Sequence, residues 1–179
     1  DKDLKFHYKF KESNEPLYVK VALSPVSPEG AQLNMEKEIP GWDFEEVRQE
    51  SADIWNKALN KLKIESSDPV VLKNFYTALY HTMIAPFAYQ DVDGKYLGMD
   101  KKVHTATPGY TNYTAFSLWD TFRALHPLMT IINPTLAQSM GESLVQGYKE
   151  GTILPKWPLA SSYTGCMVAY PAVAVLADL

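Results

Sequence analysis

The residues best suited to chemistry lie together in one short segment, residues 117–127. This segment brings together an indole, a carboxylate, a guanidinium and an imidazole, contributed by Trp119, Asp120, Arg123 and His126. In a helix, Trp119 and Arg123 share a face, and so do Asp120 and Arg123. A sugar requires a flat apolar surface for its ring and acceptors for its hydroxyl groups, which an aromatic ring beside a carboxylate supplies. The segment therefore indicates a carbohydrate-binding site.

A structural interpretation of the same residues is also open. A core tryptophan with Asp120 bonded to Arg123 is, from the residues alone, the commoner use of such side chains. We expect structural roles first for Arg123 and for His126, which precedes a proline. The segment alone therefore leaves two interpretations, a sugar subsite and part of a helical core.

Further blocks in a fixed order strengthen the first interpretation. They are residues 40–44, 74–82, 91–94, 98–100, 113–121 and 123–127 and the pair Cys166-Met167. Over about residues 19–179, the chain resembles the bacterial calcium-dependent exo-α-mannosidases of glycoside hydrolase family 92. The Leu-Trp-Asp-Thr block at 118–121 and the Arg-Ala-Leu-His-Pro block at 123–127 are the most specific part of this resemblance.

The resemblance implies a set of substrate-binding residues. It places Asp120 in the pocket for a terminal mannose and assigns substrate contacts to Trp119, Tyr163 and Cys166. The chain departs from the commoner family pattern next to this set, because Tyr163 stands where the family has Glu and Gly165 where it has Trp. The change affects the wall of the cleft, so the resemblance leaves the linkage preference open.

The resemblance also implies a reaction and a cofactor. The reaction is inverting hydrolysis of terminal α-linked mannose on glycans such as N-glycans, which needs a carboxylic acid and a carboxylate that activates water. The family places its acid, base and Ca²⁺ ligands beyond the Cys166-Met167 block. We therefore expect no catalytic residue and no metal ligand in this chain, and no turnover by it alone. Its expected partners are a mannose-containing glycan and the remainder of its own polypeptide, exported to the bacterial periplasm or cell surface.

One acidic loop begins like a calcium site. Asp91 and Asp93 precede Gly94, but an EF-hand needs Asp or Asn at its fifth position and Glu at its twelfth. This chain has Lys95 and Lys102 there. A plain turn with Gly94 at positive φ is therefore the expectation.

The remaining candidate ligands and nucleophiles carry little signal. His81 and His104 are isolated in the sequence, and no two histidines have the i, i+4 spacing of a helical metal site. Cys166 has no basic neighbour in the sequence that would lower its pKa, so we do not expect a nucleophile there. As the single cysteine, it also excludes an internal disulfide.

The composition is that of a globular chain of mixed charge. Its 179 residues are 46% hydrophobic and carry a net charge of −4. Nucleic acid is not an expected partner, because binding to phosphates needs a basic surface. No apolar run reaches the ~18 residues of a transmembrane segment.

Periodicity and capping signals predict a mainly α-helical chain. The expected helices span residues 29–38, 44–63, 68–85, 117–129, 133–150 and 166–179, after strands at 4–10 and 17–24. The helix over 117–129 is expected to stop or kink near Pro127. Asp43 and Asp68 are the expected N-caps of two of them, with Pro69 at the first helical position. Residues 86–114 carry no helical stripe, and such long irregular segments often have a function.

The resemblance implies a division of these elements into domains. Residues 1–38 would end an N-terminal β-sandwich domain, residues 39–66 would form a helical linker, and residues 67–179 would begin an (α/α)6 toroid. The apolar run 167–179 lacks a stop signal, so we expect an internal fragment of a longer protein. A non-catalytic helical carbohydrate-binding or scaffold module remains the alternative, because it would explain the aromatic residues and the missing acid/base pair.

Overall fold

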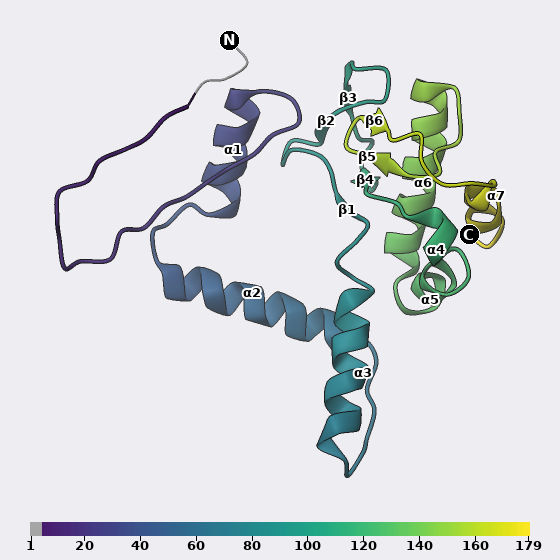
Figure 1. Cartoon of the computed structure of the whole chain (residues 1–179), viewed down its shortest axis with the longest axis horizontal. Helices are drawn as coiled ribbons and strands as arrows, with labels where there is room; N and C mark the ends of the chain where they lie inside the picture. The colour runs from purple at the N-terminus through teal and green to yellow at the C-terminus, as the bar shows by residue number, and fades with distance from the viewer. Residues whose placement is uncertain (1–4) are drawn as a thin grey trace.

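Two regions of different character make up the chain (Figure 1). The computed structural model describes residues 5–179. The N-terminal region, residues 5–84, is drawn out into a long loop and three separated helices. The C-terminal region, residues 85–179, gathers four helices and three strand pairs around one core. The chain is mainly helical, as the sequence predicts.

Local capping forms the helices of the N-terminal region. They are α1 (Pro28–Glu38), α2 (Phe44–Leu59) and α3 (Pro69–His81). The carboxylate of Asp43 accepts from the backbone N–H of Glu46 at 3.0 Å, and that of Asp68 accepts from Val70 at 2.8 Å. Both predicted N-caps are therefore confirmed, together with Pro69 in the first turn.

The C-terminal ends of α2 and α3 come earlier than predicted. After α2 the backbone tightens, with Leu62 donating to the carbonyl of Leu59. After α3, Ile84 donates to the carbonyl of His81 in the same three-residue pattern. The residue before Pro86 is biased away from helical backbone, which helps to end this segment.

The strands predicted at 4–10 and 17–24 do not form within the described residues. Residue 4 lies outside the described part, and residues 5–24 have no strand assignment. The side chains of Val19, Val21 and Leu23 remain 69%, 78% and 83% exposed. An isolated strand has no partner for its backbone hydrogen bonds, so a favourable composition alone does not produce it.

The strands of the C-terminal region are short antiparallel pairs. They are β1 (Phe87–Ala88) with β4 (Tyr113–Thr114), β2 (Lys95–Leu97) with β3 (Val103–Thr105), and β5 (Pro158–Leu159) with β6 (Ser162–Tyr163). Four of these strands lie in residues 86–114, which hold no helix, as predicted.

The helices of the C-terminal region supply most of the core. They are α4 (Leu118–Thr121), α5 (Leu125–Ile132), α6 (Pro134–Gly151) and α7 (Pro171–Ala177). Both α5 and α7 pack against α6. The core cluster consists of Phe116, Leu118, Met140, Leu144, Ala172 and Val175. It fixes α4 between the long helix α6 and the C-terminal helix α7.

Two predicted helices differ from the observed ones. The predicted helix 117–129 is broken, because α4 ends at Thr121 and α5 begins at Leu125 with Pro127 in its first turn, where a proline is tolerated. The last helix begins at Pro171 and not at residue 166. Gly165, Met167 and Ala169 have φ angles of +71°, +67° and +63°, which a right-handed helix does not permit.

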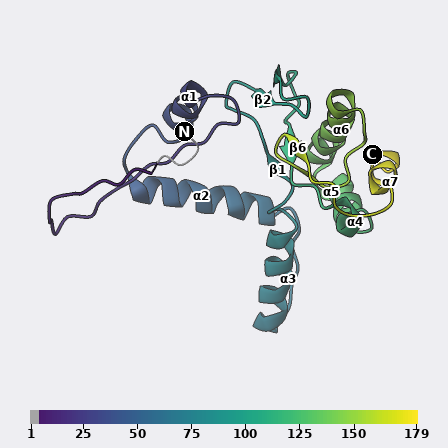
Figure 2. The same cartoon turned by 45° about the horizontal axis from the view of Figure 1, so that its top comes forward.

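One buried polar contact joins the two regions. The side chain of Asp91, 2% exposed, accepts from Ser24 Oγ at 2.6 Å and from Asn34 Nδ2 at 2.8 Å. It therefore holds α1 beside the C-terminal region, whereas α3 extends away from it (Figure 2). No helix in the described residues has the length and apolar character needed to cross a membrane.

Candidate functional site

The single-turn helix α4 presents Trp119 and Asp120 to the surface. Leu118 is fully buried in the core, which directs the two following residues outward. Trp119 is 47% exposed, and Asp120 is also exposed. Within the described residues, Trp119 is therefore not a core side chain. Leu118 provides the rigid attachment, and an indole and a carboxylate are available side by side.

A hydrogen-bond chain holds the Asp120 carboxylate. Ser117 Oγ donates to Asp120 Oδ2 at 2.5 Å, and Trp157 Nε1 donates to Ser117 Oγ at 2.8 Å. The alternative bond from Asp120 to Arg123 is not among the ion pairs of the described residues. The Arg123 guanidinium instead lies 5.3 Å from the centre of the Phe122 ring. Arg123 is consequently a neighbour of the site and not its anchor.

The same chain of contacts reaches Cys166. Thr164 Oγ1 donates to the carbonyl of Trp157 at 2.6 Å and lies 3.0 Å from Cys166 Sγ. Tyr163, 38% exposed, precedes Thr164 and pairs in β6 with Pro158 of β5. We call the set Ser117, Trp119, Asp120, Trp157, Tyr163, Thr164 and Cys166 the Asp120 rim. The structure thus links segments 117–120 and 157–166, which hold all four predicted substrate-binding residues.

A large cavity lies elsewhere. It has a volume of about 790 Å³ and runs along α6, with Glu142, Gln146 and Leu176 among its lining residues. None of the residues of the Asp120 rim lines it. In the described residues, the side chains of Trp119, Asp120 and Tyr163 in the rim are exposed.

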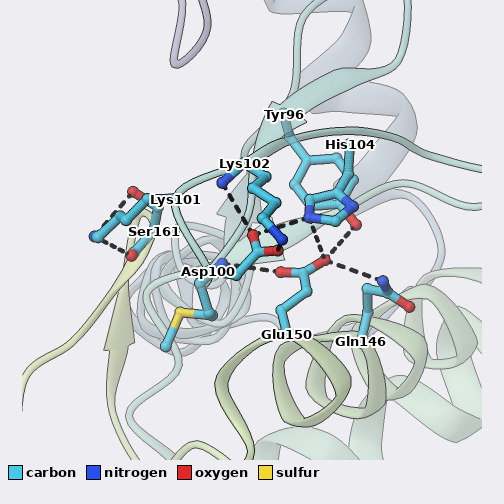
Figure 3. A network of polar contacts seen from close by, with 9 residues as sticks. Tyr96, Asp100, Lys101, Lys102, His104, Gln146, Glu150 and Ser161 are labelled. Carbon is cyan, nitrogen blue, oxygen red and sulfur yellow. Dashed lines mark hydrogen bonds and ion pairs between the residues drawn. The ribbon is translucent and has the colours of Figure 1, made fainter.

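A second polar cluster joins the β2–β3 hairpin to the C-terminal end of α6. Glu150 reaches from α6 toward Tyr96 and His104, with Asp100 beside them (Figure 3). Asp100, His104 and Glu150 each offer a ligand atom, and these atoms lie within 4.8 Å of one another. His104 is therefore not isolated, contrary to the sequence-based expectation.

The oxygens of Glu150 are already occupied by donors. Oε1 accepts from Tyr96 Oη at 2.9 Å and from Gln146 Nε2 at 3.0 Å, and Oε2 accepts from the backbone N–H of Met99 at 2.9 Å. His104 Nε2 lies 2.9 Å from Asp100 Oδ1, a direct hydrogen bond. A cation at this cluster would have to displace these bonds. The arrangement is suited to fastening the hairpin to α6.

The titration properties of the cluster agree with this description. The hydrogen bond from His104, helped by the backbone N–H of Lys102, lowers the pKa of Asp100 below its usual value. Burial, followed by the neighbouring Glu150, raises the pKa of Tyr96 above its usual value. Tyr96 therefore stays a neutral donor to Glu150 at physiological pH.

The Asp91–Gly94 loop is a turn, as predicted. Gly94 has φ of +81°. The Asp91 oxygens accept from Ser24 and Asn34, and Asp93 accepts from the Lys95 ammonium at 2.7 Å. This hydrogen bond lowers the pKa of Asp93. Calcium takes six to eight oxygen ligands, and the donors already bound to these carboxylates leave the loop poorly suited to it.

His126 has the structural position expected for it. Its ring is 2% exposed and stacks on Phe116 with centroids 6.2 Å apart. Within residues 5–179, Nε2 has no hydrogen-bond partner. Burial lowers the pKa of His126 to about 4, so the imidazole is neutral at pH 7.

Comparison with known proteins decides the family. A family model for the catalytic domain of glycosyl hydrolase family 92 matches residues 30–179. The chain belongs to this family. The resemblance seen in the sequence is thereby confirmed. No curated protein matches this family 92 chain.

Solved structures support the same assignment. The family 92 α-mannosidase BT3965 from Bacteroides thetaiotaomicron is 41% identical, with a TM-score of 0.82 over 87% of this chain and 21% of that protein. The inverting mannosidase BT2199 from the same organism is 31% identical, with a TM-score of 0.78 over 86% of this chain and 21% of that protein. The family 92 hydrolase ccman5 is 30% identical, with a TM-score of 0.68 over 75% of this chain and 19% of that protein. This chain spans about a fifth of the length of these relatives.

The sequence alone missed two features of the site. Ser117 and Trp157 are 40 residues apart, and Tyr96 and Glu150 are 54 apart. Neither separation corresponds to a helical or strand period. The sequence singled out the segment 117–127 and the block at residues 98–100, but it did not indicate the partners of Ser117 and Tyr96.

Proposed function

We propose that this chain contributes to the pocket for a terminal α-linked mannose in a glycan-degrading glycoside hydrolase. The observation that carries the proposal is the exposed pair Trp119 and Asp120 on the buried Leu118, in a family 92 catalytic domain. A related α-mannosidase has been solved in complex with mannoimidazole. The family match favours an enzyme over a non-catalytic carbohydrate-binding or scaffold module.

In the proposed pocket, Asp120 accepts hydrogen bonds from sugar hydroxyls and Trp119 offers its flat face to a sugar ring. A hydrogen bond from a hydroxyl to a carboxylate contributes roughly 1.5–3 kcal/mol once water is excluded. Tyr163 and Cys166 would border the substrate from the β6 side of the Asp120 rim. Their part in linkage preference is a proposal that follows from the departure at Tyr163 and Gly165.

The chemical step would be inverting hydrolysis with an acid and a base supplied by other parts of the polypeptide. Such a reaction needs one carboxylic acid at the leaving oxygen and one carboxylate that activates water on the opposite face. We propose that Asp120, held by Ser117, is a binding group and not a member of this pair. We therefore assign no catalytic residue within this chain.

We also propose that the complete protein depends on Ca²⁺ bound outside residues 5–179. The Asp100–His104–Glu150 cluster and the Asp91–Gly94 loop are a poor fit for the ion, because their oxygens already accept protein donors. Chelation should abolish turnover of the complete protein. Replacing Asp93 by Asn should leave the calcium requirement unchanged, which can be measured by calcium titration of the chelated enzyme.

The proposed setting of the site is an (α/α)6 toroid that begins at residue 67, after a β-sandwich domain ending at residue 38 and a linker at residues 39–66. The exposed apolar side chains of residues 17–24 support pairing of this segment with strands of such a sandwich. We propose export to the periplasm or cell surface, where glycan substrates are accessible.

The test is Asp120→Asn in the complete protein, assayed on an α-mannoside. The change keeps the shape and removes the charge, so losing two strengthened bonds should lower kcat/KM roughly a hundredfold with an unchanged melting temperature. Asp53→Asn on the exposed face of α2 is the matched control and should keep full activity. Unchanged kcat/KM in Asp120→Asn would show that Asp120 lies outside the pocket.

A further inference from the structure

We infer that Ser117 and Trp157 are positioning residues that fix the Asp120 carboxylate for the sugar, an inference that rests on the function proposed above. The three side chains form one continuous hydrogen-bond chain, from Trp157 Nε1 through Ser117 Oγ to Asp120 Oδ2. Its two links measure 2.8 and 2.5 Å. No role follows for either residue from the family blocks themselves.

The direction of this chain is set by chemistry. An indole N–H can only donate, so Ser117 Oγ must be the acceptor of the bond from Trp157. The single hydroxyl proton of Ser117 is then left for Asp120, which accepts it on Oδ2. Trp157 therefore orients the serine hydroxyl, and the serine hydroxyl orients the carboxylate.

The side chain of Ser117 does not make the hydrogen bond that is usual for its position at the start of α4. It is the N-cap residue of α4, where a serine side chain normally accepts from a backbone N–H of the first turn. In α4 the Ser117 side chain makes no such bond. Its hydroxyl instead turns to Asp120, three residues later, at the position where a capping-box side chain would reach back. The Ser117 hydroxyl therefore orients the Asp120 carboxylate in place of capping a backbone N–H of α4.

Trp157 is held firmly enough to serve as an anchor. The residue before it, Lys156, accepts at its carbonyl from the N–H of Leu118 at 3.4 Å. The residue after it, Pro158, accepts at its carbonyl from the N–H of Ala115 at 3.1 Å. Segment 156–158 is thus aligned with segment 115–118 on both sides of Trp157. The indole nitrogen therefore meets Ser117 in a defined register.

The consequence for the sugar is a carboxylate with one oxygen engaged and one available. A carboxylate has about four acceptor positions, and Ser117 uses one of them on Oδ2. Within the described residues, Oδ1 accepts no hydrogen bond. Oδ1 and the remaining position on Oδ2 can receive sugar hydroxyls without rotation of the side chain. Because the Asp120 carboxylate is already held in place, sugar binding costs less side-chain entropy.

The experiment measures kcat and KM of the complete protein on an α-mannoside for Ser117→Ala, Ser117→Thr and Trp157→Phe, each alone and in the Asp120→Asn background. We expect roughly a tenfold loss of kcat/KM for Ser117→Ala and about threefold for Trp157→Phe. Ser117→Thr keeps the hydroxyl and should retain activity. In the Asp120→Asn background the same changes should have little further effect, because coupled residues are not additive.

Matched controls are Ser66→Ala near the start of α3 and Trp42→Phe before α2, which should behave as the parent protein.

A loss of kcat/KM from Ser117→Ala that is equally large in the Asp120→Asn background would overturn the inference, since the serine would then act by another route. Unchanged kcat/KM in Ser117→Ala, with Asp120→Asn still impaired, would overturn it and leave the proposed function standing. If Asp120→Asn itself is unimpaired, the proposed function fails first. If Ser117→Ala unfolds, Trp157→Phe still decides, because it removes the indole donor to Ser117 without removing a residue of the core cluster. Its loss of kcat/KM should disappear with Asn at 120, and an unchanged kcat/KM in Trp157→Phe alone would overturn the inference.

Discussion

The N-terminal and C-terminal regions contain helices of similar quality but differ in what those helices bury. Helix α2 has sixteen residues and an N-cap at Asp43, yet none of its residues is buried. Helix α6 has eighteen residues and no side-chain cap, and seven of its residues are buried. A side-chain N-cap therefore does not indicate that a helix is packed against the rest of the protein. The signals that begin a helix are local, whereas the interactions that stabilise it depend on partners distant in sequence.

The same contrast applies to polar groups. The C-terminal region uses a buried polar side chain to hold two elements together, because Glu150 on α6, 5% exposed, accepts hydrogen bonds from Tyr96 of β2 and from the backbone of Met99. In the N-terminal region, charged pairs such as Arg48–Glu45 are exposed, and pairs of this kind contribute little to stability. The candidate site is therefore built where the backbone is best supported.

The sharpest difference in stability should come from one aliphatic residue in each region. Leu144→Ala removes a fully buried side chain from the core and should lower the free energy of unfolding by about 2–5 kcal/mol. Ile54→Ala on α2, where the side chain is 69% exposed, should change it by less than ~0.5 kcal/mol. Urea unfolding of the chain measures both. Equal losses would show that α2 is packed in solution and would remove the contrast.

The buried imidazole of His126 should make the stability of the C-terminal region depend on pH. Its pKa is about 4 in the folded chain, against 6.5 as the ordinary value. The unfolded chain therefore binds more protons between these values, so stability is complete above pH 6.5 and decreases as the pH falls toward 4. The decrease amounts to about 3 kcal/mol.

Urea unfolding of the parent chain and of His126→Phe at several pH values isolates this contribution. The parent should lose more stability than the variant between pH 7 and pH 4. Parallel curves for the two proteins would mean that His126 is accessible to protons in the folded state.

Close packing at Gly98 gives the next smaller effect. A Cβ there would lie 2.8 Å from His104 Nε2 and 2.7 Å from Glu150 Oε2, so Gly98→Ala should separate the hairpin from α6 at a cost of about 1–3 kcal/mol. At Gly41, in the N-terminal region, the added Cβ would meet nothing closer than 3.9 Å. Gly41→Ala should therefore be nearly neutral. Thermal unfolding compares the two, and a neutral Gly98→Ala would mean that the hairpin adjusts freely.

The last expected effect is local and concerns the contact between the regions. Asp91→Ala removes the acceptor of Ser24 and Asn34 and should cost about 1–3 kcal/mol, mainly as easier opening of α1. Hydrogen exchange of the α1 amides should accelerate, while exchange in α6 stays unchanged. Asp93→Ala, whose partner is the exposed Lys95, is the control. Protected α1 amides in Asp91→Ala would show that another contact holds this helix.

The outcome of the sequence predictions follows the same division between local and distant interactions. The caps at Asp43 and Asp68 could be predicted because donor and acceptor are within three residues of each other. The position of the helix break, after Thr121 and not near Pro127, and the late start of α7 could not, since the core and positive φ angles at Met167 and Ala169 impose them. The predicted strands failed because a strand requires a partner.

The candidate site was partly accessible from sequence. Trp119 and Asp120 were found through their side-chain types and the family blocks around them. Ser117 and Trp157 were not paired in advance, because a hydrogen bond between residues 40 positions apart depends on the fold. The cluster of Asp100 and His104 with Glu150 was missed for the same reason.

The most direct measurement of the central claim is a crystal structure of the complete protein with mannoimidazole, the ligand bound in a solved relative. We predict that the Asp120 carboxylate lies roughly 2.6–3.2 Å from hydroxyl oxygens of the sugar. We also predict that Ser117 Oγ still donates to Asp120 and that Trp119 lies beside the ring. A ligand bound with no contact to Asp120 or Trp119 would contradict the claim that the Asp120 rim forms part of the mannose pocket.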